Sequence, residues 1–463
     1  MLGLYVGKRN AHVKGHFDMS LNNASPDDPT QPAINGRHLT FGPTTAAGHY
    51  IPACVGRGPD DYLQYHNGKA DNRVAGSSPE AEALGEAHAV YRKWLGDHYD
   101  QDILNAILAA HASSYLKGDP LWLMVVGGSG FGKTEMLMPL EAAGAHVIST
   151  IHSEGALLSA TTSEGAKKKT ATGGMLKKIG TRGVLVLKDF TSILSMPDRT
   201  SKPMILAALR EIYDGYWVRN VGSDGGQELE WTGHLTLIGG CTTSWDTAHT
   251  TIAAMGDRFA LIRGDSRNLE DRLSAGRQAM KNTGDEVLMR AELKAASKRV
   301  ISAASTKEVT VAAEDQDAIL RAANVVTMAR SAVDFDYRGK VEYSHDPESP
   351  TRLTKELIQL MRGAIAIGLD HERALALAMR SARDSMPPIR LACLLDIAYH
   401  SESKVQHVSQ RIQRPWSAVD KALQALHSVG LLVCAAQEEA HKGKTKVSWY
   451  YTIASGVDIE AIR

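Results

Sequence analysis

A short glycine-rich segment has the residue types and spacing of a phosphate-binding loop. The pattern G-x-x-x-x-G-K-S/T is matched without a mismatch by Gly127, Gly128, Ser129, Gly130, Phe131, Gly132, Lys133 and Thr134. In such a loop backbone N–H groups surround the phosphates, the lysine reaches the β and γ oxygens, and the threonine hydroxyl binds Mg²⁺. A dinucleotide-binding turn fits less well, because a lysine stands where that pattern needs its third glycine. We therefore expect a nucleoside triphosphate site, with a chance glycine-rich turn as the alternative.

A carboxylate for the metal follows a second apolar segment. The run 183–187 is apolar, and Lys188 and Asp189 come next. An apolar strand that ends in aspartate, after a phosphate loop, predicts a carboxylate that holds the Mg²⁺ shell beside Thr134. Taken alone this pattern is weak, and a purely structural strand is the alternative.

The glutamate that polarises the attacking water in many ATPases is missing from the usual place, because Phe190 follows Asp189. Glu154 is our first candidate for this role, since it lies just past the apolar segment 146–151 and would act from a neighbouring strand. Glu211 is the second candidate. A helix-capping role for Glu154 is the open alternative.

Polar residues next to two other predicted strands are also expected near the phosphates. Two threonines follow one strand, and an arginine precedes the other. Thr242 and Thr243 follow the strand 235–239, where a polar side chain would lie beside the γ-phosphate. Arg258 precedes the strand 259–262. As an arginine finger supplied to a neighbouring subunit it would stabilise charge on the transferring phosphoryl group, and a surface charge is the alternative.

The elements that would position these residues alternate along the chain. Strands are expected at 121–126, 146–151, 183–187, 235–239 and 259–262. Short apolar strands separated by helices predict an α/β fold, with a parallel sheet whose faces are covered by flanking helices.

The chain after the last of these strands has a different character. Residues 265–384 are alanine-rich and read as helical, without strand signals. Arg352 opens an amphipathic helix there, and its guanidinium would reach back toward the nucleotide. A boundary is expected at Pro387 and Pro388, followed by three helices and two strands with 438–446 as their turn.

These patterns divide the chain into four parts, as expected because 463 residues exceed what one compact core holds. Residues 1–82 form an irregular N-terminal segment of unknown role, and 83–264 form the core with the phosphate loop. Residues 265–386 form the helical region, and 387–463 form the last domain.

The overall composition excludes several classes of protein. Lys+Arg and Asp+Glu are both 52, so the net charge is zero, and a uniformly basic DNA-coating protein is not expected. The four cysteines are widely spaced, which argues against a zinc ribbon or a disulfide framework. We find neither a secretory signal nor an apolar run long enough for a membrane span, so we expect a cytoplasmic protein without membrane partners.

Taken in order, the motifs resemble those of the AAA+ ATPases. The phosphate loop, the Asp189 strand, the strand before Thr242, then Arg258 and a helical region with Arg352 follow one another as in that family. The chain looks most like minichromosome-maintenance-type helicases and the replication helicases of phages and mobile elements. The resemblance implies an ATPase core that uses ATP and Mg²⁺, an all-helical lid and a C-terminal winged helix. It also implies a homo-oligomer, a hexameric ring, with DNA, single-stranded above all, and other replication proteins as partners.

In the helicases that the chain resembles, a β-hairpin before the sensor strand points into the ring channel and pulls on DNA. Residues 217–231 occupy this place, and Asp224 with Gly225 between β-prone arms is itself a hairpin signal. The tip carries no lysine, and Arg219 on one arm is its candidate DNA contact.

Two lysine clusters are further candidates for DNA contact. They are Lys167, Lys168 and Lys169 before the Asp189 strand, and Lys442, Lys444 and Lys446 on the predicted wing. Lysines of this kind bind phosphates without reading sequence. A solvated loop is the alternative for the first cluster, and a protein-binding module for the second.

Our hypothesis from the sequence is a ring-forming, ATP-dependent DNA motor, a replication helicase of a phage or mobile element. A helicase loader and an ATP-dependent DNA-binding regulator are the alternatives. Strand displacement separates the helicase from both.

Overall fold

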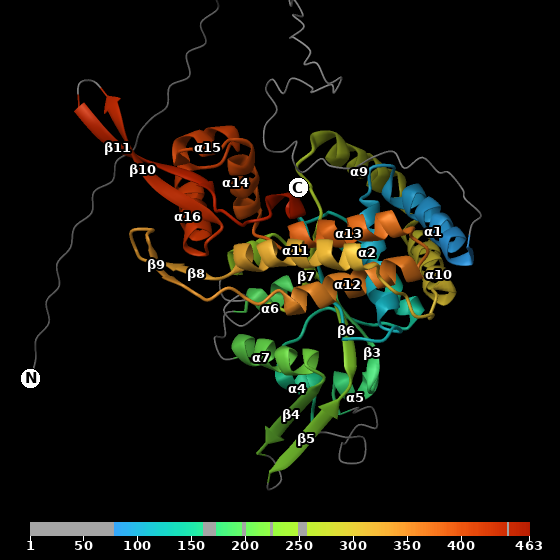
Figure 1. Cartoon of the computed structure of the whole chain (residues 1–463). Coiled ribbons are helices and arrows are strands. Elements are labelled where there is room, and N and C mark those ends of the chain that lie inside the picture. Colours follow the sequence, from blue (N-terminus) through green and yellow to red (C-terminus); the bar gives the residue numbers. More distant parts are fainter. Residues whose placement is uncertain (1–77, 161–172, 197–200, 223–225, 249–256, 442–443) are drawn as a thin grey trace, which may run out of the picture. The chain divides into compact units, whose positions relative to one another are not determined.

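The structure is a computed structural model of the chain. It describes residues 78–160, 173–196, 201–222, 226–248, 257–441 and 444–463 (Figure 1). All of these belong to one compact unit, Arg57–Arg463. Among them no helix combines the length and the apolar character that crossing a membrane requires.

A five-stranded parallel sheet lies at the centre of this unit. Its strands are β1 (Trp122–Val126), β2 (His146–Ile148), β3 (Arg182–Leu187), β6 (His234–Cys241) and β7 (Ala260–Arg263). They are arranged in the order β2-β3-β6-β1-β7, and every neighbouring pair is parallel. The predicted α/β fold with a parallel sheet is thus confirmed. The ends of the strands differ from the predicted ones by one or two residues, except that β2 stops three residues early.

Both faces of the sheet are buried, because alternate residues of each strand point to opposite sides. Leu123, Val125 and Ile262 pack into one core with α2 (Gln101–Ser113), α12 (Thr351–Ala366) and α13 (His371–Asp384). Met124, Leu187 and Leu261 pack into a second core with α5 (Met175–Ile179), α6 (Thr191–Leu194) and α7 (Ser201–Tyr213). The apolar strands of the sequence are therefore the middle of three layers.

Three further helices of the first layer continue its core away from the sheet. They are α1 (Pro79–Leu95), α10 (Glu286–Ala303) and α11 (Ala313–Arg330). Helix α9 (Leu269–Lys281) lies beside α1 and contributes no buried residue. Helix α12 packs closely against α2. A Cβ added to Gly363 would lie 2.1 Å from the carbonyl oxygen of Ala109 on α2, so only glycine allows this approach.

The region predicted to be helical without strands also contains a hairpin, so the expectation of an all-helical segment was wrong. Strands β8 (Val333–Phe335) and β9 (Val341–Ser344) pair antiparallel. Asp336 holds their turn, because its Oδ1 accepts the N–H groups of Arg338 at 2.9 Å and Lys340 at 2.8 Å. Gly339 has φ +76°, a conformation that favours glycine. The aspartate and glycine between β-prone residues were the signal for this turn.

The C-terminal elements follow the predicted order. Helices α14 (Pro388–Tyr399), α15 (Val405–Arg411) and α16 (Trp416–Ser428) precede the antiparallel pair β10 (Leu432–His441) and β11 (Lys444–Ile453). A short bridge between Ser403 and Tyr451 adds a third strand segment beside this pair.

A second hairpin extends from the sheet near α4 (Glu154–Leu157) (Figure 1). Its strands are β4 (Tyr216–Val221) and β5 (Gln227–Thr232), with Trp217 opposite Trp231. The hairpin predicted over 217–231 is therefore confirmed. Its tip, 223–225, lies outside the described residues.

Candidate nucleotide-binding site

The predicted phosphate loop joins the end of β1 to the short helix α3 (Lys133–Leu137). Gly127 donates its N–H to the carbonyl of Cys241 at 3.1 Å, which fixes the start of the loop against β6. Gly130 and Gly132 have φ values of +79° and +86°, which side chains disfavour. These glycines let the backbone curl back before the helix begins, as the sequence motif predicts. Pro139 then ends the regular helix, and a 3₁₀ turn follows over Met138–Ala143.

Lys133 points into the loop. Its Nζ donates to the carbonyl oxygens of Gly127 at 2.8 Å and Gly128 at 2.7 Å. Burial lowers the pKa of Lys133, and the nearby Cys241 and Asp189 oppose that shift. Neutral carbonyls are weaker partners for an ammonium group than phosphate oxygens. The residue is thus held where an anion in the loop would take over its hydrogen bonds.

Asp189 lies at the same edge of the sheet. Its backbone N–H donates to Ser149 at 3.0 Å, and the next N–H, of Phe190, donates to Gly240 at 2.8 Å. Its carboxylate is exposed and accepts a hydrogen bond from Ser192 Oγ. The Thr134 side chain is exposed as well.

A hydroxyl and a carboxylate are oxygen donors that suit Mg²⁺, which usually takes its remaining ligands from substrate phosphates and water. No group of three or more His, Cys, Asp or Glu residues in the described part of the chain is arranged to hold a metal by itself. The oxygen donors of Thr134 and Asp189 would suit a metal that arrives with a nucleotide.

The threonine after β6 is adjacent to the loop. β6 pairs with β1 through Cys241 and Val126, so Thr242 lies next to the first glycine of the loop. Its N–H donates to Thr191 Oγ1 at 3.0 Å, and its hydroxyl is 2.7 Å from Ser244 Oγ. Thr243 is exposed. The structure therefore brings together the loop, Asp189 and Thr242 at the carboxyl ends of β1, β3 and β6.

Glu154, the first candidate for a catalytic base, is the first residue of α4 and forms an ion pair. Arg219 donates its Nε to Glu154 Oε1 at 3.0 Å and its Nη1 to the carbonyl of Leu158 at 2.7 Å. The structure thus joins two residues that the sequence assigned to different tasks. Glu211 is exposed on α7.

Arg352 and Arg258 lie at the other end of β7. Arg352 donates to the carbonyl of Asp257 at 3.1 Å and to Glu348 Oε1 at 2.9 Å. Asp257 precedes β7, whereas the phosphate loop contacts Gly264 after it, through the bond from Gly264 N–H to Val126 at 2.8 Å. The structure therefore does not bring Arg352 to the phosphates of its own chain. Arg258 donates to Asp214 Oδ2 at 3.2 Å, and its side chain is 12% exposed.

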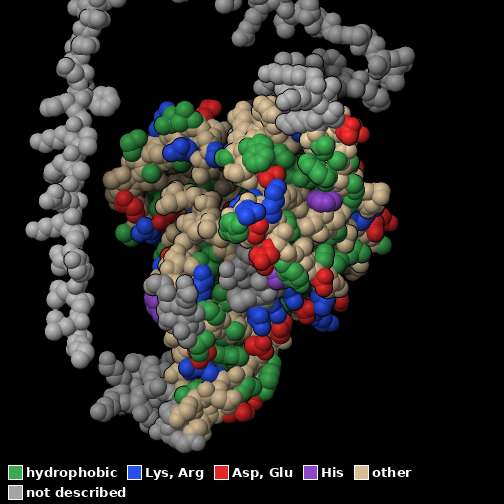
Figure 2. Space-filling view, turned by 90° about the vertical axis from the view of Figure 1, so that its left-hand side faces the viewer, with side chains coloured by type: hydrophobic (Ala, Val, Ile, Leu, Met, Phe, Trp, Pro, Cys, Tyr) green, Lys and Arg blue, Asp and Glu red, His purple; other side chains and the backbone are tan. Residues whose placement is uncertain are grey.

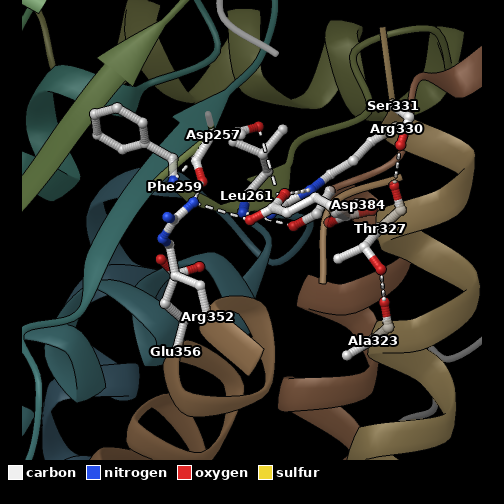
Figure 3. Close-up of polar contacts among 12 residues, drawn as sticks. Asp257, Phe259, Leu261, Ala323, Thr327, Arg330, Ser331, Arg352, Glu356 and Asp384 are labelled. Atoms are coloured by element: carbon white, nitrogen blue, oxygen red, sulfur yellow. Dashed lines mark hydrogen bonds and ion pairs between the residues drawn. The ribbon is translucent and has the colours of Figure 1, made fainter. Parts of the chain in front are cut away.

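A buried ionic cluster surrounds this end of β7. Figure 3 shows Arg330 from α11 and Arg352 from α12 directed toward Asp257. Arg330 donates to Glu348 Oε2 at 2.8 Å, and its Nη1 is 3.8 Å from Asp257 Oδ2. Burial raises the pKa of Asp257, and it raises the pKa of Glu356 to about 8. The cluster fastens the helical layer to the sheet.

Sequence reasoning missed an arginine beside the phosphate loop. Arg263, the last residue of β7, makes a bidentate pair with Asp246, with N–O distances of 2.8 and 3.0 Å. Its Nε donates to the carbonyl of Asp384 at 2.6 Å. Arg263 thus ties the segment after Thr242 to the helix α13. The strand predicted from the sequence ended one residue before Arg263. The sequence signal for this residue was therefore an arginine directly after a buried strand.

The candidate DNA contacts are the two lysine clusters and Arg219. Lys167, Lys168, Lys169 and Lys442 lie outside the described residues, and only the backbone of β11 is described at Lys444 and Lys446. Arg219 lies in the middle of β4 and is bound to Glu154. On the side of the molecule shown in Figure 2, Lys and Arg side chains are interspersed with Asp and Glu.

Two solved structures that match the chain are only weakly similar to it. No protein-family model matches the chain, and no curated protein does. The two structures are A-form apo structures of the NrS-1 C-terminal region. The first is 11% identical with a TM-score of 0.22, and the second is 9% identical with a TM-score of 0.19. Each match covers 81% of this chain and 75% of the other. A similarity at this TM-score carries no argument about fold or function.

Proposed function

We propose that the chain is an ATP hydrolase of the AAA+ type that acts on DNA in the cytoplasm. The proposal rests on the observation that three functional groups lie at the same edge of the sheet. The phosphate loop with Lys133, the carboxylate of Asp189 and the hydroxyl of Thr242 all lie at the carboxyl ends of neighbouring parallel strands. Ligands of parallel α/β sheets bind at this edge.

The residues of the site have separate tasks in this proposal. The loop amides and Lys133 bind the β- and γ-phosphates and stabilise the charge that spreads over them as the terminal phosphoryl group leaves. When bound with the nucleotide, Mg²⁺ supplies further charge neutralisation, and Thr134 and Asp189 hold it. Thr242 orients the γ-phosphate, and Glu154 orients the attacking water once Arg219 has released it.

The remaining regions support a motor that acts on DNA. We interpret the helices after β7 as the lid of the ATPase and the elements α14–β11 as a winged helix, because three helices followed by an antiparallel pair have that order. The β4–β5 hairpin is the candidate for moving a DNA strand. We propose a hexameric ring that serves as a replication helicase of a phage or mobile element.

A helicase loader is the second candidate. It is favoured by the ion pair of Glu154 with Arg219 and by the absence of an acid after Asp189. A site with its base engaged elsewhere would hydrolyse ATP slowly and use the nucleotide as a switch. A DNA-binding regulator is the third reading, and it rests on the winged helix alone.

The proposal is tested by measuring ATP turnover with and without single-stranded DNA, together with the native mass of the protein. Turnover that DNA stimulates in an oligomer supports the motor. Strand displacement then identifies a helicase, whereas slow turnover without displacement identifies a loader. Sequence-specific protection of duplex DNA identifies the regulator. A purified protein that neither binds nor hydrolyses nucleoside triphosphates refutes all three.

A further inference from the structure

Helix α9 carries an apolar face that nothing in the described structure covers. The helix has 13 residues, none of which is buried. Leu269, Leu273 and Met280 are 66%, 49% and 71% exposed. A Cβ added to Gly276 would meet no atom within 4 Å. Isolated helices of this length are marginal in water, so a helix without buried residues needs a partner surface.

These four residues lie on one face. Their spacing of four, three and four residues places Leu269, Leu273, Gly276 and Met280 in one stripe along the helix. The opposite side of α9 makes its contacts within the chain through polar groups. Gln278 donates to the carbonyl of Lys93 at 3.0 Å, and Asp271 pairs with His98 at 2.9 Å. The stripe therefore points away from α1, which α9 contacts.

The stripe begins beside the phosphate loop. The N–H of Gly264 donates to the end of β1. Ser266 lies against the loop, since a Cβ added to Gly128 would be 2.6 Å from Ser266 Oγ. Asn268 then caps α9, accepting the N–H of Glu270 at 2.9 Å. Whatever covers α9 is thus a neighbour of the nucleotide site.

A second face, which no described residue covers, lies on α7 and on Asp214 directly after it, next to Arg258. Met204, Ala207, Glu211 and Asp214 are all exposed, and their spacing of three or four residues places them together. Arg258 donates to Asp214, and its guanidinium lies 5.7 Å from the centre of the Tyr213 ring. This α7 face is apolar at its start and acidic at its end.

We propose that the α9 face of one chain binds the α7 face of a second copy. The two faces complement each other, because Leu269, Leu273 and Met280 would bury Met204 and Ala207. The exposed basic residues of α9 would meet the acids of α7; they are Arg272, Arg277 and Lys281. A single chain cannot join its own two faces, since α9 and α7 lie apart in it (Figure 1). The contact is therefore head to tail.

This arrangement rests on the proposed function, and it names the partner of the nucleotide site. It sets Arg258 of one copy beside the phosphate loop of the next, whereas in its own chain Arg258 precedes β7 and the loop contacts the residue after that strand. A head-to-tail contact that closes on itself gives a ring.

The test uses two variants that each damage one face. Leu273→Glu damages the α9 face, and Met204→Glu damages the α7 face. Both side chains are exposed, at 49% and 43%, so neither change disturbs the folded core. Leu320→Glu is the matched control, because Leu320 is 45% exposed on α11, away from both faces. Circular dichroism melting confirms that all three variants fold.

Sedimentation gives the first result. The wild type and Leu320→Glu are expected to assemble, and each face variant is expected to need at least about tenfold higher concentration to do so. In a mixture of the two face variants, the intact α9 face of Met204→Glu can bind only the intact α7 face of Leu273→Glu. The mixture should therefore form dimers with one chain of each variant and no larger assembly. Assembly of Leu273→Glu as in the wild type, or a wild type that stays monomeric with ATP and DNA, overturns the proposal.

ATP turnover of the mixture gives the second result. The single complete site joins the phosphate loop of the Met204→Glu chain to Arg258 of the Leu273→Glu chain. Adding Lys133→Ala to the first chain should abolish the turnover of the mixture, and adding it to the second should not. Equal losses from both additions overturn the assignment. Because sedimentation needs no turnover, loss of the ATPase proposal with intact dimers remains distinguishable from failure of this contact.

Discussion

Arg219 of the β4–β5 hairpin is bound to Glu154, the residue we assign as the catalytic base, with 3.0 Å between Nε and Oε1. The pair is largely shielded from water, with side chains 21% and 24% exposed. Because one oxygen of the Glu154 carboxylate accepts this hydrogen bond, it is not available to orient a water molecule while the pair is formed. The hairpin and the nucleotide site are thereby linked through one ion pair.

The first prediction concerns this base. Glu154→Gln should still bind ATP but hydrolyse it at least about 10²-fold more slowly, since a positioned base contributes that much. Glu211→Gln should have a milder effect, because Glu211 is exposed on α7. Nucleotide binding and turnover of both variants are measured side by side. Full turnover in Glu154→Gln together with its loss in Glu211→Gln would show that we chose the wrong glutamate.

A second prediction concerns the partner of that base. Arg219→Gln should raise ATP turnover in the absence of DNA and reduce the further stimulation by DNA, because Glu154 is then no longer restrained. Arg210→Gln is a control on the neighbouring helix α7. Unchanged turnover at every DNA concentration would mean that the ion pair is only structural.

The third prediction is that Arg258 acts on the nucleotide of a neighbouring subunit. Arg258→Ala and Lys133→Ala should each be inactive alone, whereas a mixed oligomer should regain part of the activity. One of its interfaces pairs an intact loop with an intact arginine, which can be worth about 10³–10⁵ in rate. Absence of rescue in an oligomer shown by mass to be mixed would place Arg258 in its own chain's site or outside catalysis.

The buried cluster at the start of β7 gives a fourth prediction, on pH. Burial raises the pKa of Glu356 to about 8 in the folded protein, from 4.5. Between these two pH values the Glu356 carboxyl is protonated in the folded state and ionised in the unfolded state. The contribution of Glu356 to the free energy of unfolding therefore falls as the pH rises. Glu356→Gln keeps an acceptor for Tyr213, whose hydroxyl is 3.0 Å from Glu356 Oε1.

Melting temperatures of the wild type and of Glu356→Gln from pH 5 to pH 9 check this point. The variant should gain stability relative to the wild type as the pH rises through this range. Glu372→Gln, an exposed position, serves as the control. A difference between Glu356→Gln and the wild type that stays constant with pH would show that Glu356 is ionised throughout.

A fifth prediction concerns Lys167, Lys168 and Lys169. Each phosphate contact adds about 0.7 to the salt slope of single-strand binding, so the triple alanine variant should flatten the slope by roughly two units. The loss should be similar for all DNA sequences, because such contacts do not read bases. An unchanged slope with intact ATP binding would show that DNA follows another path.

Local patterns sufficed to predict the sheet and the phosphate loop. The strands β1, β3, β6 and β7 consist largely of apolar residues, and the loop follows β1 directly, so each could be predicted from neighbouring residues. The hairpin β8–β9 was missed because its strands are short and interrupt an alanine-rich helical stretch. The turn at Asp336 and Gly339 was its only local signal.

The side-chain partners within the site were not predictable in the same way. Glu154 and Arg219 are 65 residues apart in the sequence, and only the packing of the hairpin on α4 brings them together. Arg352 begins the amphipathic helix that was predicted, but its position depends on how α12 packs against α2. That packing directs it to Asp257 rather than to the phosphates.

ATP turnover in the purified Lys133→Ala variant tests the assignment of the nucleotide site most directly. Lys133 donates to two carbonyls of the loop and is the only loop side chain that carries a positive charge. We expect turnover to fall by at least about 10²-fold, and Asp189→Ala to cause a similar loss. Lys298→Ala, at an exposed position on α10, should keep wild-type turnover. Turnover near the wild-type rate in a folded Lys133→Ala protein would contradict the assignment of this loop as the nucleotide site.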